Sequence, residues 1–537
     1  MTMLLEQRMT KLINHGLQPA LTGSLFGLEK ESLRVSAEGK IAQTPHPRIL
    51  GSALTHPFIT TDYSEALLEL ITPPCNTIAD TLAFLEHTQA FVQQHLENEI
   101  LWANSMPCIV TGESSIAIAE YGSSNLGQMK TVYRRGLGHR YGRMMQVIAG
   151  VHFNFSLSNA FWAGYQDCEA DPQSAQDFIS SRYLAMIRNL QRYGWLVPYL
   201  FGASPTVCKS FIDGVAAGLE VFDEFTYYQP YATSLRLGDI GYQNSKEHDA
   251  GIQVCYDTLD AYIRSLTHAI ETPFPEYDKI GVKVNGEYQQ LNSNLLQIEN
   301  EYYNTVRPKQ LVGREEKPSL ALKKRGIRYI ELRSLDLNVY EPLGVTASQL
   351  HFLEGFLLFC LLDDSPYIDR DERRAINANQ LHTAHRGREP GLTLQRGNHD
   401  ITLKDWANEL FSQMQACYTL LDAAHSSGTQ HSDIYMKAFN QYHALIQDPD
   451  LTPSARIIAE MRDTSEAFFP FSMRYSQQHA QYFRNIVLDN EQMNFFQQHA
   501  TDSLAEQERL ETSDTLSFDQ FLDRYFSQRG EQTSTAN

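Results

Sequence analysis

The sequence predicts an α+β fold, and three observations support this class. Strand-like runs alternate with helical runs up to about residue 345, several of these runs have one apolar and one polar face, and the patterns beyond residue 400 are almost all helical. Antiparallel sheets commonly pack one face on a core and keep the other face polar. The 537 residues are enough to bury a large core, and the sequence contains no internal repeat.

The first strand candidate, "GLEKESLRV" at residues 27–35, carries two carboxylates in a mostly apolar run. As a strand it puts Glu29 and Glu31 on one face, about 6.6 Å apart. A divalent cation would turn their repulsion into binding, because hard cations prefer oxygen ligands. Two alternatives stay open: a solvated face, and a helix in which Glu31 pairs with Arg34 at i,i+3.

The next segment, "SEALLELIT", has an ambiguous period. It places Glu65 and Glu69 together either as helical i,i+4 neighbours or on one strand face, and Asp62 lies just upstream. Either structure adds carboxylates to those of the first strand candidate.

In two later segments, apolar and polar residues alternate along the chain, as expected for strands with one buried face. "VHFNFSL" puts His152 and Asn154 opposite its aromatic side chains, and "RYIELRS" puts Glu331 and Arg333 on one face. For His152 alone, a hydrogen-bonded core histidine is the alternative. A sheet that lines a cleft with its polar face would bring together Glu29, Glu31, Glu69, His152, Glu331 and Arg333.

The last part of the chain has helix start signals. Thr402 and Asp405 stand at capping-box spacing, Thr452 precedes a proline, and Ser517 precedes Gln520 by three residues. We therefore predict a catalytic core at 1–400, a helical C-terminal part packed on the core at 401–525, and a disordered tail at 526–537.

Composition excludes several classes of protein. With 64 acidic and 44 basic residues the formal charge is −20, which disfavours binding of nucleic acid through its phosphates. The seven cysteines contain no C-x-x-C pair and are interpreted as reduced thiols. The start lacks the apolar core of a secretory signal, and the longest apolar run, "GFLLFCLL", is far shorter than the roughly 20 residues of a membrane span. A cytoplasmic protein with no membrane partner is expected.

Several carboxylates with one histidine suit Mg²⁺ or Mn²⁺, which usually act on phosphates. Arginines complete such sites, and Arg134, Arg236 and Arg333 are candidates. No G-x-x-x-x-G-K-[ST] loop is present, so an ATP site must be built differently. A solvated helix face is the alternative for the basic run 134–143, and ordinary packing is the alternative for the tyrosines.

Seven ordered strings resemble the proteobacterial type of glutamate-cysteine ligase, also called gamma-glutamylcysteine synthetase. They are "GLEKESLRV", "GSALTHPFITTDYSEALLELITP", "AGVHFNFSL", "PYLFGASP", "PYATSLRLGD", "LQIENEYYNTVRPK" and "GIRYIELRSLD". The resemblance covers about residues 20 to 345 strongly. It implies a glutamine-synthetase-like fold, in which a curved, mainly antiparallel sheet forms a cup. It also implies ATP-dependent joining of L-glutamate to L-cysteine through gamma-glutamyl phosphate, the first step of glutathione synthesis.

The resemblance also implies roles for single residues. Metal ligands or their close supports are Glu29, Glu31, Asp62, Glu69, His152 and Glu331. Arg333 and Arg236 would hold the phosphoryl group or glutamate, Arg134 would contact phosphate, and Tyr133, Tyr242 and Tyr303 would surround the cysteine. The run around Arg134 is more basic than the family pattern, so Arg135 and Arg140 receive no role.

The resemblance implies Mg²⁺ or Mn²⁺, with ATP as a co-substrate, and leaves glutathione feedback and a monomeric state as open expectations. Two alternative functions remain: a ligase that joins glutamate to another amine, and a metal- and nucleotide-binding regulator without catalysis. The regulator would lack one of the strand carboxylates, and none is missing.

Overall fold

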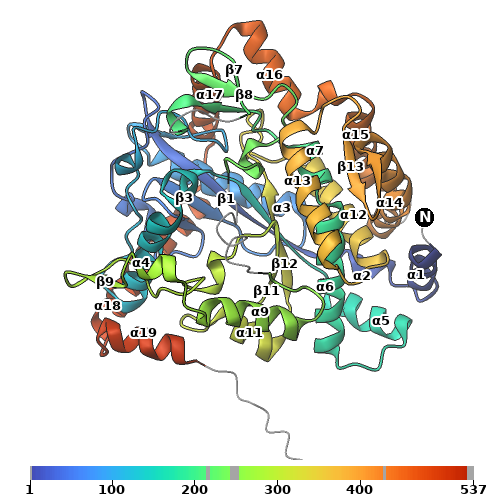
Figure 1. Ribbon diagram of the computed structural model, residues 1–537, viewed down its shortest axis with the longest axis horizontal. Helices are drawn as coiled ribbons and strands as arrows, with labels where there is room; N and C mark the ends of the chain where they lie inside the picture. The colour runs from blue at the N-terminus through green and yellow to red at the C-terminus, as the bar shows by residue number, and fades with distance from the viewer. Residues whose placement is uncertain (1–2, 213–217, 242–252, 427–430, 529–537) are drawn as a thin grey trace, which may run out of the picture.

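A computed structural model describes residues 3–212, 218–241, 253–426 and 431–528, and its elements are labelled in Figure 1. The largest sheet in these residues has seven strands in the order β11-β12-β5-β1-β3-β2, with β4 paired to β1 at one side. Its strands are β1 (Leu25–Ser36), β2 (Ile59–Thr61), β3 (Leu67–Ile71), β4 (Glu99–Leu101), β5 (Val151–Ser156), β11 (Val306–Lys309) and β12 (Tyr329–Leu335). All its strand pairs are antiparallel, which confirms a mixed α and β protein with an antiparallel sheet.

Three smaller antiparallel sheets accompany it. They consist of β6 (Thr206–Cys208), β7 (Glu220–Val221) and β8 (Thr226–Tyr228); β9 (Lys283–Val284) and β10 (Glu287–Tyr288); and β13 (Thr393–Arg396) and β14 (His399–Thr402).

Helices surround the sheets. In the N-terminal half they are α1 (Met3–Asn14), α2 (Gln18–Leu21), α3 (Ile78–Gln94), α4 (Asn125–Tyr141), α5 (Asn159–Glu169), α6 (Ala175–Tyr193) and α7 (Leu196–Phe201). Next come α9 (Leu259–Glu271), α10 (Pro275–Asp278), α11 (Pro318–Arg325), α12 (Ala347–Leu362) and α13 (Arg370–Arg386). The last are α14 (Leu403–His425), α15 (Ile434–Gln447), α16 (Pro453–Thr464), α17 (Phe468–Asn485), α18 (Asn490–Ser513) and α19 (Phe518–Ser527).

The "GLEKESLRV" run lies inside the long strand β1, so the helical alternative that pairs Glu31 with Arg34 is wrong. The ambiguous "SEALLELIT" run contains strand β3. Among its residues, Glu65 lies before the strand and its carboxylate accepts hydrogen bonds from the backbone N–H groups of His46 and Glu120. The strand interpretation therefore holds for both segments, but Glu65 lies outside β3 and does not join Glu69 on a strand face.

The predicted caps are confirmed. Side chains of Thr402, Thr452 and Ser517 accept hydrogen bonds from backbone N–H groups at the starts of α14, α16 and α19. The predicted tail begins too early, because α19 continues to Ser527, and residues 529–537 lie outside the described residues. The division of the chain at residue 400 stays a prediction.

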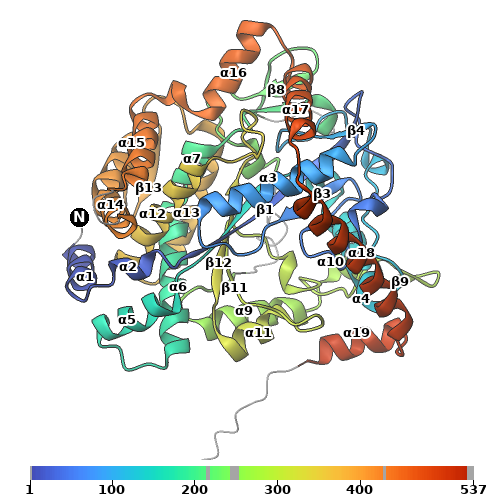
Figure 2. The same cartoon turned by 180° about the vertical axis from the view of Figure 1, so that it is seen from behind.

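One face of the main sheet is apolar and buried. Leu28 pairs with Phe153, which pairs with Leu332, and all three side chains are buried. Helix α3 packs on this face, in front of the sheet in Figure 2. Lys30 lies on the same face and donates from Nζ to Oε1 of Gln89 in α3 at 2.6 Å. The other face is left for polar side chains.

Helix α12 contains the "GFLLFCLL" run and is buried along almost its whole length. It packs against α6, α14 and α15, which lie together beside the sheet in Figure 1. The run is therefore the centre of a helical layer. Within the described residues, no helix has both the length and the apolar character that crossing a membrane requires.

Candidate active site

The strand register gathers the predicted polar residues on one face of the main sheet. Glu31 pairs with Glu69 of β3, and Glu29 pairs with His152 of β5. On the other side of β5, Asn154 pairs with Glu331 of β12. Directly paired residues of neighbouring strands share a face, so four strands present these side chains together.

His152 lies at the centre of this group. Its Nδ1 is 3.2 Å from Oε2 of Glu29 and 3.5 Å from Oε1 of Glu331, and its Nε2 is 3.5 Å from Oε1 of Glu31. In two sets, Glu29, His152 and Glu331 and then Glu31, Glu69 and His152, the ligand atoms lie within 4.8 Å of one another. The polar face thus offers two adjoining candidate cation sites.

The carboxylates of the two sets differ in charge environment. Burial, followed by the charges of Glu29, Asp62 and Glu31, raises the pKa of Glu69 well above its usual value. Burial also raises the pKa of Glu31. Burial opposes ionisation of Glu331 too, but Lys309 and then Arg333 hold its pKa well below the usual range. Crowded carboxylates of this kind fit a bound divalent cation, which would supply the positive charge they lack.

Asp62 lies beside these sets and belongs to neither of them within the described residues. Its Oδ1 is 3.9 Å from Nη2 of Arg134, and its backbone carbonyl accepts a hydrogen bond from Nε of the same arginine. Asp62 therefore orients Arg134 at the edge of the carboxylate group.

A cavity of about 110 Å³ adjoins the polar face. Among its lining residues are Tyr133, Arg134, Tyr303 and Arg333, all of them predicted site residues. Arg333 also donates from Nη1 to Oε1 of Glu331 at 2.9 Å, so this guanidinium connects the cavity with the carboxylates. Tyr242, the third predicted tyrosine, lies outside the described residues.

Arg236 lies beside Gly150, the residue just before β5. Its Nη2 donates to the carbonyl of Arg333 at 3.0 Å, and its Nη1 lies 3.5 Å from Oδ1 of the buried Asp336. A Cβ at Gly150 would lie 2.1 Å from Arg236 Nη2, so any larger residue there would displace the guanidinium. The N–H of Gly150 donates to Glu31 at 2.8 Å, which places Arg236 and Glu31 on either side of one glycine.

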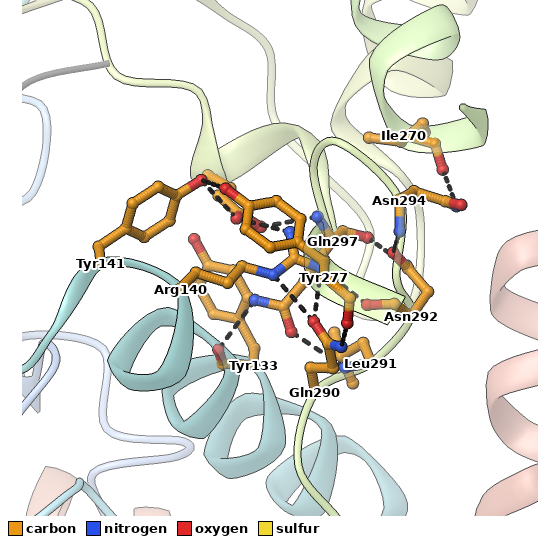
Figure 3. A network of polar contacts seen from close by, with 11 residues as sticks. Tyr133, Arg140, Tyr141, Ile270, Tyr277, Gln290, Leu291, Asn292, Asn294 and Gln297 are labelled. Atoms are coloured by element: carbon orange, nitrogen blue, oxygen red, sulfur yellow. Dashed lines mark hydrogen bonds and ion pairs between the residues drawn. The ribbon is translucent and has the colours of Figure 1, made fainter. Parts of the chain in front are cut away.

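Arg140, to which the sequence assigned no role, belongs to a buried network (Figure 3). Its side chain and that of Glu301 are both fully buried, and they form an ion pair of 2.8 Å. Arg140 also donates to Gln290 at 3.0 Å from Nε and to the carbonyl of Asn292 at 2.7 Å, while its guanidinium lies 4.1 Å from the ring centre of Tyr277. The network ties α4 to the segment 290–301.

The same network reaches the cavity wall. Glu301 accepts a hydrogen bond from the hydroxyl of Tyr141 at 2.9 Å and from the N–H of Gln297 at 2.6 Å. Gln297 in turn donates to the carbonyl of Tyr133 at 3.2 Å. Because Tyr303 lies two residues after Glu301, the network sets the spacing between the two predicted tyrosines.

Sequence reasoning missed two basic residues of the polar face, Arg307 and Lys309 in β11. Arg307 pairs with Glu331 in the strand register and lines the cavity, and Lys309 Nζ lies 3.3 Å from Oε2 of Glu331. Their i,i+2 spacing in "VRPK" was the available signal. Pro308 between them masks it, because proline in a strand is confined to edges such as β11.

Carboxylates and arginines on one sheet face, beside a cavity lined with further arginines and tyrosines, are typical of enzymes that use divalent cations to act on anionic substrates. Comparison with known proteins identifies the family within this class. A family model described as glutamate-cysteine ligase matches residues 9–383. The chain belongs to the glutamate-cysteine ligase family.

Individual relatives agree with the family match. A glutamate-cysteine ligase of Alcanivorax borkumensis is 46% identical over 531 residues, which cover 97% of this chain and 99% of the relative. The crystal structure of the Francisella tularensis glutamate-cysteine ligase in complex with AMP has a TM-score of 0.87 at 35% identity, covering 94% of this chain and 97% of that one. A bifunctional glutathione synthetase of Pasteurella multocida has a TM-score of 0.69 at 27% identity, covering 88% of this chain and 55% of that one.

Proposed function

We propose that the polar face of the main sheet binds Mg²⁺ or Mn²⁺ and that the adjoining cavity receives the amino-acid substrates. The ion ligands would be Glu29, Glu31, Glu69, His152 and Glu331, with Asp62 as a neighbouring support. The observation that carries this proposal is the pair of ligand sets that share His152. In the glutamine-synthetase-like arrangement that we infer, the sheet curves into a cup around this face.

The protein is an ATP-dependent ligase. It joins the gamma-carboxylate of L-glutamate to the amine of L-cysteine and forms gamma-glutamylcysteine, ADP and phosphate, the first step of glutathione synthesis. ATP is a co-substrate, in keeping with the AMP bound in the Francisella tularensis relative.

The reaction needs two steps, because a carboxylate is a poor electrophile. An oxygen of the glutamate gamma-carboxylate first attacks the terminal phosphorus of ATP, and ADP leaves. The cysteine amine then attacks the carbonyl carbon of the acyl phosphate, loses a proton and expels phosphate. Bound divalent cations would supply positive charge to the phosphates in both steps.

In this proposal the arginines hold the anionic groups in place. Arg333 lies between Glu331 and the cavity, where it would contact the transferring phosphoryl group. Arg236, held by Asp336 and the Arg333 carbonyl, would hold glutamate or phosphate from the side of Gly150. Arg134, oriented by Asp62, would contact phosphate at the cavity edge. Fixed guanidinium groups lower the cost of developing negative charge, because they are already oriented.

Tyr133 and Tyr303 would form the cysteine side of the cavity, together with Tyr242 from outside the described residues. Both described tyrosines line the cavity. Burial raises the pKa of the Tyr133 hydroxyl, so this hydroxyl stays protonated and can donate a hydrogen bond. A neutral aromatic wall of this kind suits a small thiol.

A coupled ADP-release assay with glutamate and Mg²⁺, run with and without cysteine, tests the proposal. We expect ADP release that depends on both cysteine and Mg²⁺. Release with an amine that lacks the thiol in preference to cysteine would point to a related ligase. Absence of any turnover would point to a regulator.

A further inference from the structure

Arg307 differs from the other arginines of the cavity in its charge partners. Arg134 lies 3.9 Å from Asp62, and Arg333 lies 2.9 Å from Glu331. Arg307 lines the same cavity, yet among the described residues it makes no ion pair within 4.0 Å. The nearest elements therefore leave one positive charge of the cavity without a balancing carboxylate in contact.

The Arg307 guanidinium is nevertheless held in place. Its Nη2 donates to the carbonyl of Asn300 at 2.9 Å and also to the carbonyl of Tyr302. Asn300 belongs to the segment 290–301 that the Glu301 and Arg140 ion pair ties to α4, and Tyr302 follows it directly. The two backbone carbonyls fix the orientation of the guanidinium group but carry no net charge. The group is therefore positioned without being neutralised.

A partly buried cation of this kind is costly unless an anion reaches it. Burial, and then the charge of Arg333, lowers the pKa of Arg307, and the charge of Glu331 on the neighbouring strand opposes this shift only in part. A guanidinium matches a carboxylate with two parallel hydrogen bonds. A substrate carboxylate entering the cavity would therefore meet a donor group already oriented toward it.

We propose that Arg307 binds the α-carboxylate of the amino acid that supplies the attacking amine. Arg307 donates to the segment that leads directly into Tyr303, and Tyr303 stands on the cysteine side of the proposed cavity. Holding the α-carboxylate there would orient the adjacent amine toward the acyl phosphate. The inference rests on the proposed placement of cysteine beside the tyrosines, and it makes Arg307 a specificity residue for α-amino acids over simple amines.

The test compares cysteine with cysteamine, which has the same amine and thiol but no carboxylate. For Arg307→Gln we expect kcat/KM with cysteine to fall roughly 100-fold, the effect of losing a charge-assisted contact, and kcat/KM with cysteamine to change less than about threefold. Arg307→Lys keeps the positive charge but not the two parallel N–H donors of the guanidinium. It should therefore give an intermediate fall of kcat/KM with cysteine. Product formation is measured by mass spectrometry at saturating ATP and glutamate.

Arg328→Gln is the matched control, because Arg328 is an exposed arginine just before β12 and does not line the cavity. This variant should leave kcat/KM unchanged both with cysteine and with cysteamine. Melting temperatures of both Arg307 variants identify any loss of folding, and a displaced Tyr303 would lower the rates with both amines alike.

Equal losses with cysteine and cysteamine would overturn the proposal. A rise in KM for glutamate at an unchanged cysteine-to-cysteamine ratio would also overturn it and assign the carboxylate to glutamate. These results are distinct from failure of the proposed function, which would appear as absence of cysteine-dependent ADP release in the unaltered protein.

Discussion

At the scale of single residues, His152 connects the two candidate cation sites. Its Nδ1 lies near Glu29 and Glu331, and its Nε2 lies near Glu31. An imidazole has two ring nitrogens on opposite sides, so one side chain can serve both ligand sets.

Glu29→Gln should abolish most metal-dependent turnover. The change removes one negative charge while the amide keeps the size of the side chain, and Asn154 Nδ2, now 2.8 Å from Glu29 Oε1, still has an oxygen to bind. Losing a direct ligand should cost more than the roughly 10- to 100-fold that losing a supporting group costs. The measurement is kcat/KM across a Mg²⁺ titration, alongside the melting temperature.

Glu97→Gln is the control for this change, since Glu97 is exposed in the turn before β4. It should behave as the unaltered protein does. Wild-type kinetics of Glu29→Gln at saturating Mg²⁺ would remove Glu29 from the ligand set.

At the scale of elements, α4 and the segment 290–301 form the wall of the cavity. The Arg140 and Glu301 pair that joins them is fully buried. Removing one partner of such a pair leaves an uncompensated charge in a low-dielectric site. The stability of this wall therefore depends on both partners being present.

Arg140→Met should lower the free energy of unfolding by about 3–5 kcal/mol, because Glu301 remains buried without its cation. Adding Glu301→Gln should restore part of this loss, since the second change removes the stranded charge. Urea unfolding of both variants provides the measurement. If the double variant is less stable than Arg140→Met alone, the two losses add, and the explanation by a stranded charge fails.

The helical layer contains a buried carboxyl group, Glu354 in α12. It is 1% exposed and accepts a hydrogen bond from the hydroxyl of Tyr435 at 2.7 Å. Burial raises the pKa of Glu354 from its usual 4.5 to about 8. The folded state therefore holds a proton between these pH values that the unfolded chain has lost, so this group makes the protein less stable as pH rises from about 4.5 to about 8.

Glu354→Gln should remove this pH dependence. The stability of the variant relative to the unaltered protein should grow with pH across this window, by at most about 1.4 kcal/mol for each pH unit. Urea unfolding at several pH values from 5 to 8 measures the difference. The exposed Glu491→Gln is the control, and a difference that stays constant with pH would contradict the assigned burial effect.

At the scale of the whole molecule, the end of the chain supports the cavity. Phe521, Leu522 and Tyr525 of α19 form a separate apolar cluster with Met129 and Val132 of α4. Val132 directly precedes Tyr133, so a helix near residue 520 backs a residue of the proposed cysteine side.

Phe521→Ala should loosen this support. Truncating a buried phenylalanine typically costs about 3–5 kcal/mol, and here the loss falls on the docking of α19 against α4. We expect a lower melting temperature and a raised KM for cysteine, with KM for ATP little changed. Val487→Ala, at a side chain 90% exposed, is the control. An unchanged KM for cysteine would separate α19 from the cavity.

The sequence by itself determined the class of fold, the family and which polar residues of a strand share a face. Strand side chains alternate with period two, so Glu29 and Glu31 had to share a face once β1 was a strand. The ordered motifs indicated the activity, because together they resemble one family. Local patterns of this kind involve neighbours in the chain, and for that reason they can be read without a structure.

Only the tertiary structure decided which of these side chains meet. His152 reaches Glu29 and Glu331 because β5 lies between β1 and β12, a neighbourhood set by strands far apart in sequence. Asp62 proved to orient Arg134, Arg140 proved to be a buried partner of Glu301, and Arg307 proved to line the cavity with no carboxylate of the described residues within ion-pair distance. Long-range register and packing determine such pairings, and no local spacing encodes them.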